Sequence, residues 1–116
     1  MAEAFEITAG ESRGRAAVVR LRGRLDAGGV QALLNHTSRV LAAEQNLVLN
    51  LSQVSFIGSS GVGALLVTLE MFREQGCDVR FVELSAAVAA AIQVLNLDRF
   101  LPIEASEDVA ISKLAA

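Results

Sequence analysis

Two adjacent serines, Ser59 and Ser60, are the residues of this sequence best suited to reversible chemistry. A serine hydroxyl can carry a phosphate, and it can also accept a hydrogen bond from the free N–H groups at the start of a helix. Gly58 and Gly61 flank the pair and allow the close backbone approach that a sharp turn needs. The pattern alone leaves two interpretations open, a phosphoacceptor site or a helix cap beside a turn residue.

The segments on either side of this turn change from the pattern of a strand to that of a helix. Residues 47–51 form a near-unbroken apolar run, which suits a central strand covered on both faces. After the turn, apolar residues recur every three or four positions, at Val62, Leu65, Leu66, Leu69 and Phe72. This spacing predicts one buried stripe of a helix. The serines would then lie at the positive end of that helix, where a phosphate is tolerated.

The rest of the chain predicts four more strands and three more helices. The strands are expected at residues 5–8, 17–25, 78–84 and 101–103, and the helices at 27–43, after Ser85 and after Ser106. Asp26 and Ser85 are expected to cap the helices that follow them, and Gly76 to end the second helix. Because each strand–helix–strand unit implies parallel pairing, we expect a small mixed sheet with helices packed on it.

Two further patterns concern the surfaces of these elements. The strand at residues 17–25 carries three arginines on one face, Arg20, Arg22 and Arg24. They form either a solubilising sheet face or a surface that steers an acidic partner. The third helix is expected to bury a stripe made of Val88, Ile92 and Leu95.

The turn sequence Ile57-Gly58-Ser59-Ser60-Gly61-Val62-Gly63 resembles the signature of STAS domains, most closely of the bacterial anti-sigma factor antagonists. Their pattern is an apolar strand, a short loop, then Asp-Ser-Ser/Thr-Gly-hydrophobic-Gly opening a helix. The tetrapeptide Gly23-Arg24-Leu25-Asp26 likewise resembles the Gly-x-Leu-Asp that follows their second strand. The resemblance covers nearly the whole chain in element order. It implies a single STAS domain over residues 1–116, an α/β fold with a small mixed four- to five-stranded sheet and about four helices packed on it.

By this resemblance, Ser59 matches the serine that the cognate anti-sigma factor phosphorylates, with Ser60 as a secondary candidate. Asp26 is then expected close to Ser59 in space. Gly58 stands where the family has an acidic residue, which is a departure from the pattern. The partner-binding residues that the resemblance implies are Asp26, Phe56, Ile57, Gly58, Ser60, Gly61 and Val62. An exposed apolar rim near Phe56, Ile57 and Val62 is expected to give this contact its area.

The resemblance implies a regulatory binding module that is not an enzyme and needs no cofactor. In the family, the antagonist binds an anti-sigma factor that is also a serine kinase, which frees the sigma factor. The kinase uses ATP to phosphorylate the antagonist, and a PP2C-type phosphatase resets it. The alternative is a STAS module outside sigma control, acting without phosphorylation as a scaffold or in a membrane-associated complex such as one for lipid transport. A weak homodimer is left open.

Composition argues against several other classes of protein. With 116 residues and a formal net charge of −3, the chain is not expected to bind nucleic acid directly. No apolar stretch reaches membrane-spanning length, and acidic Glu3 and Glu6 stand where a signal peptide would be basic. A single cysteine, Cys77, fits a reducing compartment, so a cytoplasmic protein without membrane insertion is expected. The lone histidine, His36, is distant from Ser59 in sequence, so neither a catalytic triad nor a metal site is expected.

Overall fold

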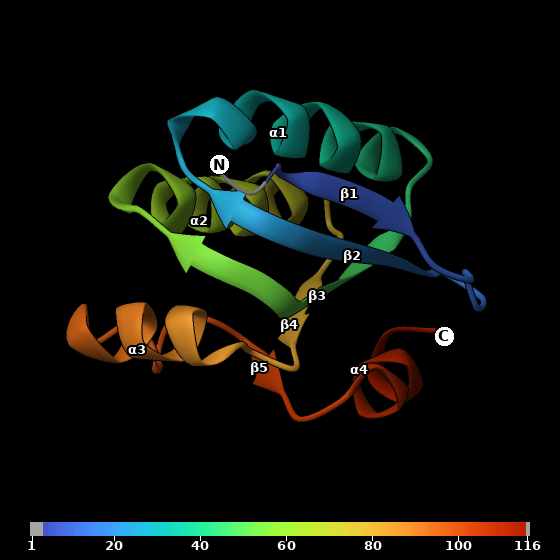
Figure 1. Ribbon diagram of the computed structural model, residues 1–116. Helices are drawn as coiled ribbons and strands as arrows, with labels where there is room; N and C mark the ends of the chain where they lie inside the picture. The colour runs from blue at the N-terminus through green and yellow to red at the C-terminus, as the bar shows by residue number, and fades with distance from the viewer. Residues whose placement is uncertain (1–3, 116) are drawn as a thin grey trace.

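The computed structural model of the chain describes residues 4–115, in which five strands form one sheet and four helices pack on it. The strands are β1 (Glu6–Ala9), β2 (Ala16–Leu25), β3 (Asn46–Ile57), β4 (Val79–Val82) and β5 (Ile103–Glu104). The helices are α1 (Ala27–Ala42), α2 (Ser59–Glu74), α3 (Ala86–Val94) and α4 (Glu107–Leu114). Figure 1 shows α1 and α2 on one face of the sheet and α4 on the other. The predicted α/β fold with a small mixed sheet and about four helices is confirmed.

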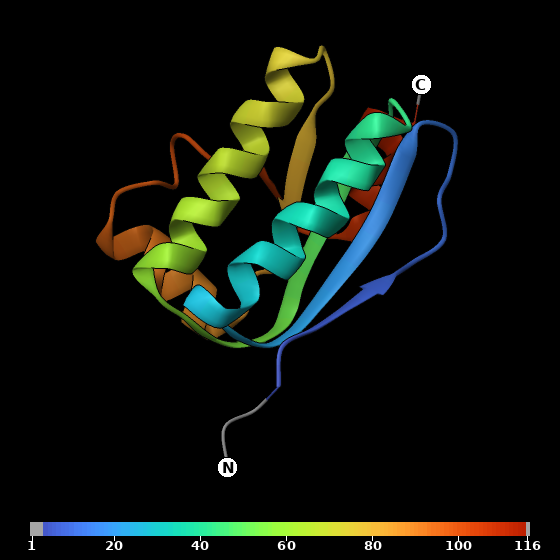
Figure 2. The same ribbon diagram turned by 90° about the horizontal axis from the view of Figure 1, so that it is seen from above.

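The strands lie in the sheet in the same order as in the chain. β1 pairs with β2 in antiparallel orientation, whereas β2 to β5 pair in parallel, as the strand–helix–strand units predict. β3 is central, and two register shifts against β2 allow Ile57 to pair with Leu25 at its end. The carboxyl ends of β2 and β3 therefore meet, and the starts of α1 and α2 lie together at that end of the sheet (Figures 1 and 2).

The ends of two strands have local causes. β3 extends to Ile57, beyond the apolar run at 47–51 that predicted the strand. The register shifts interrupt the regular alternation of side chains, so the second half of the strand has no clean period of two. β4 ends at Val82 because the next residue, Glu83, has a positive φ of 52°. A residue in this left-handed region breaks the extended chain of a strand.

The last strand also begins later than predicted, at Ile103 instead of residue 101. The carbonyl oxygen of Pro102 accepts a hydrogen bond from the Phe81 N–H at 2.9 Å. The proline itself has no N–H to donate, so regular pairing with β4 starts only beyond it. β5 is an edge strand, as the proline predicted.

The predicted helix ends are confirmed at three positions. Ser85 Oγ accepts a hydrogen bond from the Val88 N–H at 3.2 Å, and Ser106 Oγ does the same for Val109 at 3.2 Å. Gly76 has a φ of 76°, the left-handed conformation in which glycine commonly ends a helix. These local signals fix where α2 stops and where α3 and α4 begin.

The main core lies between the sheet and helices α1, α2 and α3, and it is predominantly aliphatic. Val88 and Ile92 of α3 are buried in it, as predicted. The prediction for Leu95 is wrong, because α3 ends at Val94 and Leu95 is 51% exposed. The end of α3 therefore presents apolar side chains to solvent.

A second, smaller core lies between α4 and the opposite face of the sheet. It consists of Ala16, Val18, Val48, Val82, Ala110, Ile111 and Leu114. Only three of these residues, Ala110, Ile111 and Leu114, come from α4, a helix of eight residues, so their burial stabilises the α4 contact only modestly. Hydrogen bonds at both ends of the helix also hold α4 on the sheet.

Glu107, at the first position of α4, joins this helix to β2 and β3. Its carboxylate accepts two hydrogen bonds from the guanidinium of Arg20, at 2.8 and 2.9 Å, and one from Asn50 Nδ2 at 2.6 Å. Chiefly the Arg20 hydrogen bond, and also that of Asn50, holds the pKa of Glu107 below its usual range despite partial burial. Such charge-assisted bonds are stronger than neutral ones, so they fix the start of α4 on the sheet.

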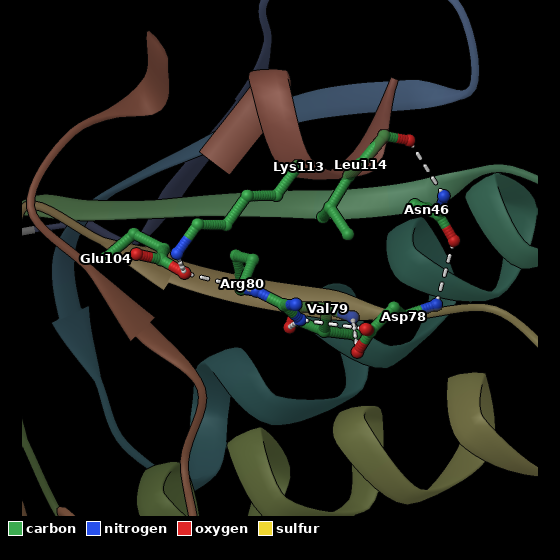
Figure 3. Close-up of polar contacts among 7 residues, drawn as sticks. All are labelled: Asn46, Asp78, Val79, Arg80, Glu104, Lys113 and Leu114. Atoms are coloured by element: carbon green, nitrogen blue, oxygen red, sulfur yellow. Dashed lines mark hydrogen bonds and ion pairs between the residues drawn. The ribbon is translucent and has the colours of Figure 1, made fainter. Parts of the chain in front are cut away.

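The other end of α4 is tied down by the contacts shown in Figure 3. Lys113 Nζ and Arg80 Nε approach the same oxygen of Glu104, at 2.9 and 3.3 Å. Hydrogen bonding by Lys113 is the main reason that the pKa of Glu104 lies below its usual range. Asn46 Nδ2 donates to the carbonyl of Leu114 at 2.9 Å. Both ends of α4 are thus bonded to the sheet.

Candidate partner-binding site at the start of helix α2

The chain turns from β3 into α2 at Gly58, which is the N-cap of the helix. The Gly58 N–H donates to the carbonyl of Leu25 at 3.1 Å, and the Gly58 carbonyl accepts from the Val62 N–H at 3.0 Å. The first bond joins the ends of β2 and β3, and the second starts the helix. Asp26 and Ser59 each directly follow a residue of this joint, so they lie at the same end of the sheet.

Ser59 and Ser60 occupy the first two helical positions of α2 and are both exposed. The expectation that one of the serines caps the helix is wrong, because Gly58 holds the N-cap position and supplies no side-chain acceptor. Within residues 4–115, neither hydroxyl has a hydrogen-bond partner. Both hydroxyls are therefore accessible and not used by the fold.

The two glycines of the turn have different structural roles. A Cβ at Gly61 would lie 2.5 Å from the Leu25 carbonyl oxygen, so only glycine lets α2 pack this closely on β2. A Cβ at Gly58 would meet only the Phe56 ring, at 3.5 Å, which is an ordinary contact. The φ of Gly58 is −94°, a value that any residue adopts. Gly61 is thus required by packing, whereas position 58 accommodates a Cβ atom without a clash.

Asp26 is the N-cap of α1, as predicted. Its Oδ1 accepts a hydrogen bond from the Gly28 N–H at 3.1 Å. Its Oδ2 lies 3.8 Å from Arg24 Nε, too far for a hydrogen bond, and both side chains are partly exposed. Asp26 therefore has a structural role of its own and keeps one oxygen available at the surface.

Phe56 lies beneath the guanidinium of Arg24, whose central carbon is 4.0 Å from the centre of the ring. This is the geometry of a cation–π contact. Phe56 is 38% exposed. The pair presents an aromatic edge and a cation next to the turn that carries Ser59.

The predicted apolar rim is only partly correct. Phe56 is exposed, but Ile57 and Val62 are 9% and 4% exposed and belong to the core. The exposed apolar side chains on the other side of Ser59 come instead from the end of α3, where Val94 is 80% and Leu95 51% exposed. The apolar periodicity of α3 predicts Leu95 in the core, so it gives no sign of this exposed surface.

An open groove of about 340 Å³ separates the first turn of α2 from α3. We call it the α2–α3 groove; it is lined by Ile57, Gly58, Ser59, Val62, Ala90, Ala91, Val94 and Leu95. Figure 2 shows the start of α2 beside α3. The two alanines leave the space, and the buried faces of Ile57 and Val62 form part of the wall. Ser59 thus lies on the edge of an apolar depression.

A family model of the STAS domain matches residues 9–110. The chain belongs to the STAS domain family. The match includes both sequence motifs, the tetrapeptide ending at Asp26 and the turn that carries Ser59. STAS membership therefore rests on the sequence as well as on the fold.

Several similar proteins are anti-sigma factor antagonists. The chain is 31% identical over 100 residues to the anti-sigma-F factor antagonist RsfA of Mycobacterium tuberculosis, covering 84% of this chain and 78% of the relative. Its fold is similar to an anti-sigma factor antagonist from Mycobacterium paratuberculosis, with a TM-score of 0.81, 27% identity and 96% of both chains covered. It is also similar to the anti-sigma factor antagonist SpoIIAA in its unphosphorylated form, with a TM-score of 0.73, 25% identity and 95% of both chains covered.

Within the described part of the chain, no helix has both the length and the apolar character that crossing a membrane requires.

Proposed function

We propose that this STAS domain is an anti-sigma factor antagonist, switched by reversible phosphorylation at Ser59. It binds a serine-kinase anti-sigma factor through the surface around Ser59 and thereby frees the sigma factor. The similarity to RsfA and SpoIIAA supports the class of partner. The observation that carries the proposal is the exposed Ser59 hydroxyl on the first turn of α2, which the fold does not use.

Phosphorylation at this position changes binding more than folding. A phosphate adds about −1.5 to −2 charges at neutral pH. At the start of a helix that charge gains roughly 0.3–1 kcal/mol from the helix dipole, so the domain stays folded. In an interface built for a neutral hydroxyl, the same charge must lose its water without a compensating partner. The phosphorylated form therefore releases the anti-sigma factor.

The partners supply the chemistry of this cycle, and the domain itself is a binding module without catalysis. The kinase transfers the terminal phosphoryl group of ATP to the Ser59 oxygen, and a PP2C-type phosphatase hydrolyses the phosphate ester. Ser60 is the secondary acceptor. We assign the whole chain, residues 1–116, to a single STAS domain that works in the cytoplasm, where these partners act.

Gly58 supports an alternative, a STAS module that acts as an unphosphorylated scaffold or in a membrane-associated complex. The acidic side chain that precedes the serine in the family is replaced here by a hydrogen atom. If that side chain orients the hydroxyl or the kinase's metal, its loss slows phosphoryl transfer. Asp26, which has one oxygen free of hydrogen bonds at the same end of the sheet, is the residue best placed to substitute for it.

The proposal is tested by intact-mass spectrometry after incubation with ATP and each serine-kinase anti-sigma factor of the source organism. We expect the mass to rise by one phosphate in the wild type and in Ser60→Ala, but not in Ser59→Ala. A gain in the wild type would also establish that Gly58 permits the transfer.

Two outcomes would contradict the proposal. Stable binding to a kinase without any mass gain would indicate a constitutive antagonist or scaffold. The absence of both binding and mass gain with every kinase would favour the STAS module outside sigma control.

A further inference from the structure

The α2–α3 groove lies directly beside Ser59, and its lining has a chemistry of its own. Resting on the proposed function, we propose that the groove receives an aliphatic or aromatic side chain of the anti-sigma factor. Phosphorylation of Ser59 then expels that side chain. The helix α3 becomes part of the partner-binding surface, although neither sequence motif includes it.

The groove is apolar throughout. None of its eight lining residues carries a charge, and the Ser59 hydroxyl is the one hydrogen-bonding side chain among them. Its volume of about 340 Å³ is near the lower end of the range for small-molecule sites. Such sites add several converging polar groups that fix a ligand's orientation, whereas this lining offers a single side-chain hydroxyl, that of Ser59. The groove thus matches an uncharged, apolar protein side chain better than a polar metabolite.

The far wall of the groove is formed by the end of α3. Ala90 and Val94 are four residues apart, as are Ala91 and Leu95, so all four lie on neighbouring parts of one helix face. Val94 and Leu95 are exposed, and covering their apolar surface removes it from water, which favours association. The surface to be covered is continuous with Ser59, because Ser59 itself lines the groove. The partner that contacts Ser59 is therefore the one positioned to fill it.

The position of Ser59 explains how a single phosphate can prevent the partner's side chain from entering the groove. A phosphate on Ser59 stands at the edge of the groove and keeps a shell of water that an apolar side chain would have to displace. Entry of that side chain would strip the charge of water without offering a hydrogen bond. Phosphorylation of Ser59 therefore weakens binding because it removes the apolar contact in the groove.

The test is to fill the groove with a side chain of its own. Ala90 lines the groove and is exposed, whereas its neighbour Ala89 is exposed but does not line it. Leucine is a good helix former, so Ala90→Leu and Ala89→Leu should both fold, which circular dichroism and thermal melting would verify. We expect Ala90→Leu to weaken binding to the anti-sigma factor by about tenfold, the cost typical of blocking a central contact. Ala89→Leu should bind within about twofold of the wild type, because it leaves the groove open.

A second pair of variants tests whether binding depends on the groove itself or on exposed apolar surface in general. Leu95→Ser removes apolar surface from the groove, and Val109→Ser removes it from α4, where Val109 is 41% exposed. We expect only Leu95→Ser to weaken binding. If added apolar bulk in Ala90→Leu strengthens binding, or if both α3 variants bind like the wild type, the groove is not occupied.

Failure of the proposed function would look different. In that case the wild type itself would bind none of the kinases. If the wild type binds and Ser59→Glu does not, while Ala90→Leu and Leu95→Ser bind normally, the switch stands and the groove inference alone is overturned.

Discussion

Around α4, the buried polar side chains make hydrogen bonds to other residues of the domain, whereas around Ser59 exposed hydroxyls make none in the described part of the chain. Glu107 is shared between Arg20 and Asn50, and within the described residues no buried side-chain nitrogen or oxygen lacks a hydrogen-bond partner. At the start of α2, two exposed hydroxyls have no partner within residues 4–115, and apolar side chains stand in solvent beside them. The side chains around α4 are thus used by the fold, whereas the hydroxyls at the start of α2 are free for the partner contact proposed above.

The arginines of β2 illustrate the same contrast within one strand. Arg20 makes two short hydrogen bonds to Glu107, so its charge serves the attachment of α4. Arg22 and Arg24 lie 3.8 Å from their nearest carboxylates, Glu6 and Asp26, and make only loose surface pairs. Attachment of α4 by Arg20 is neither of the two roles predicted for this face. A solubilising surface or steering of an acidic partner remains a prediction for Arg22 and Arg24.

The largest expected effect comes from placing a charge on the free surface. Ser59→Glu should weaken binding to the anti-sigma factor by about a hundredfold, because a carboxylate must be desolvated in the interface. Thermal stability should be unchanged or slightly higher, since an acidic residue suits the start of a helix. Calorimetric titration and thermal melting would measure the two effects. Ser38→Glu, at an exposed position of α1, is the matched control; equal losses in both variants would contradict the contrast between the two surfaces.

The second effect concerns the internally bonded surface and should appear in stability instead of binding. Glu107→Ala removes the acceptor of Arg20 and of the buried Asn50 amide, so we expect a loss of about 2 kcal/mol in the free energy of unfolding. Asp108→Ala changes the neighbouring residue, whose side chain is 86% exposed, and should cost less than about 0.5 kcal/mol. Urea unfolding would measure both. If correctly folded Glu107→Ala binds the anti-sigma factor more weakly than the wild type, the contacts around Glu107 do not serve folding alone.

Acid should reproduce part of the Glu107 effect. Because its pKa is lowered in the folded state, its contribution to stability is complete above the ordinary carboxyl pKa of 4.5 and is lost as the pH falls through the folded-state value. The effect should be smaller than that of Glu107→Ala, since a protonated carboxyl still fills the site. Unfolding curves between neutral and acidic pH would show a steeper acid loss in the wild type than in Glu107→Gln. Parallel curves would argue against this linkage.

The smallest effect is expected from restoring the family's acidic residue. Gly58→Asp supplies a side-chain acceptor at the N-cap of α2 and should stabilise the domain by a few tenths of a kcal/mol relative to glycine, and by about 1 kcal/mol relative to Gly58→Ala. Thermal melting of the three proteins would measure this order. If Gly58→Asp is less stable than Gly58→Ala, the turn does not have the capping geometry described above.

Local signals in the sequence predicted the element order, the mixed sheet and the caps at Asp26, Ser85 and Gly76. They succeeded because each depends on residues close together in the chain. The sequence pattern also predicted Ser59 at the start of α2, but it left open whether one of the serines is the N-cap, which is Gly58. That detail depends on whether Gly58 still belongs to the strand or already to the helix, and φ and ψ angles decide it.

Other features depend on contacts between distant segments and could not be predicted. The hydrogen bond between Asn50 and Glu107 joins residues 57 positions apart, and no local sequence pattern around either residue predicts it. Leu95 fits the apolar period of α3, yet the helix ends one residue earlier and turns it into solvent. The burial of Ile57 likewise follows from how α2 and α3 pack around the turn, whereas the burial of Val62 agrees with the apolar stripe predicted for α2.

The order of strands in the sheet has a consequence for how the chain folds. Each strand pairs with its neighbour in sequence, so the sheet can grow by closing one moderate loop at a time. The bonds from Arg20 to Glu107 instead span 87 positions. Closing a loop of that length costs more conformational entropy, so we expect α4 to dock after β2, β3 and β4 have paired. Because the hydrogen bonds around α4 join the first third of the domain to the last, we expect these two parts to unfold together.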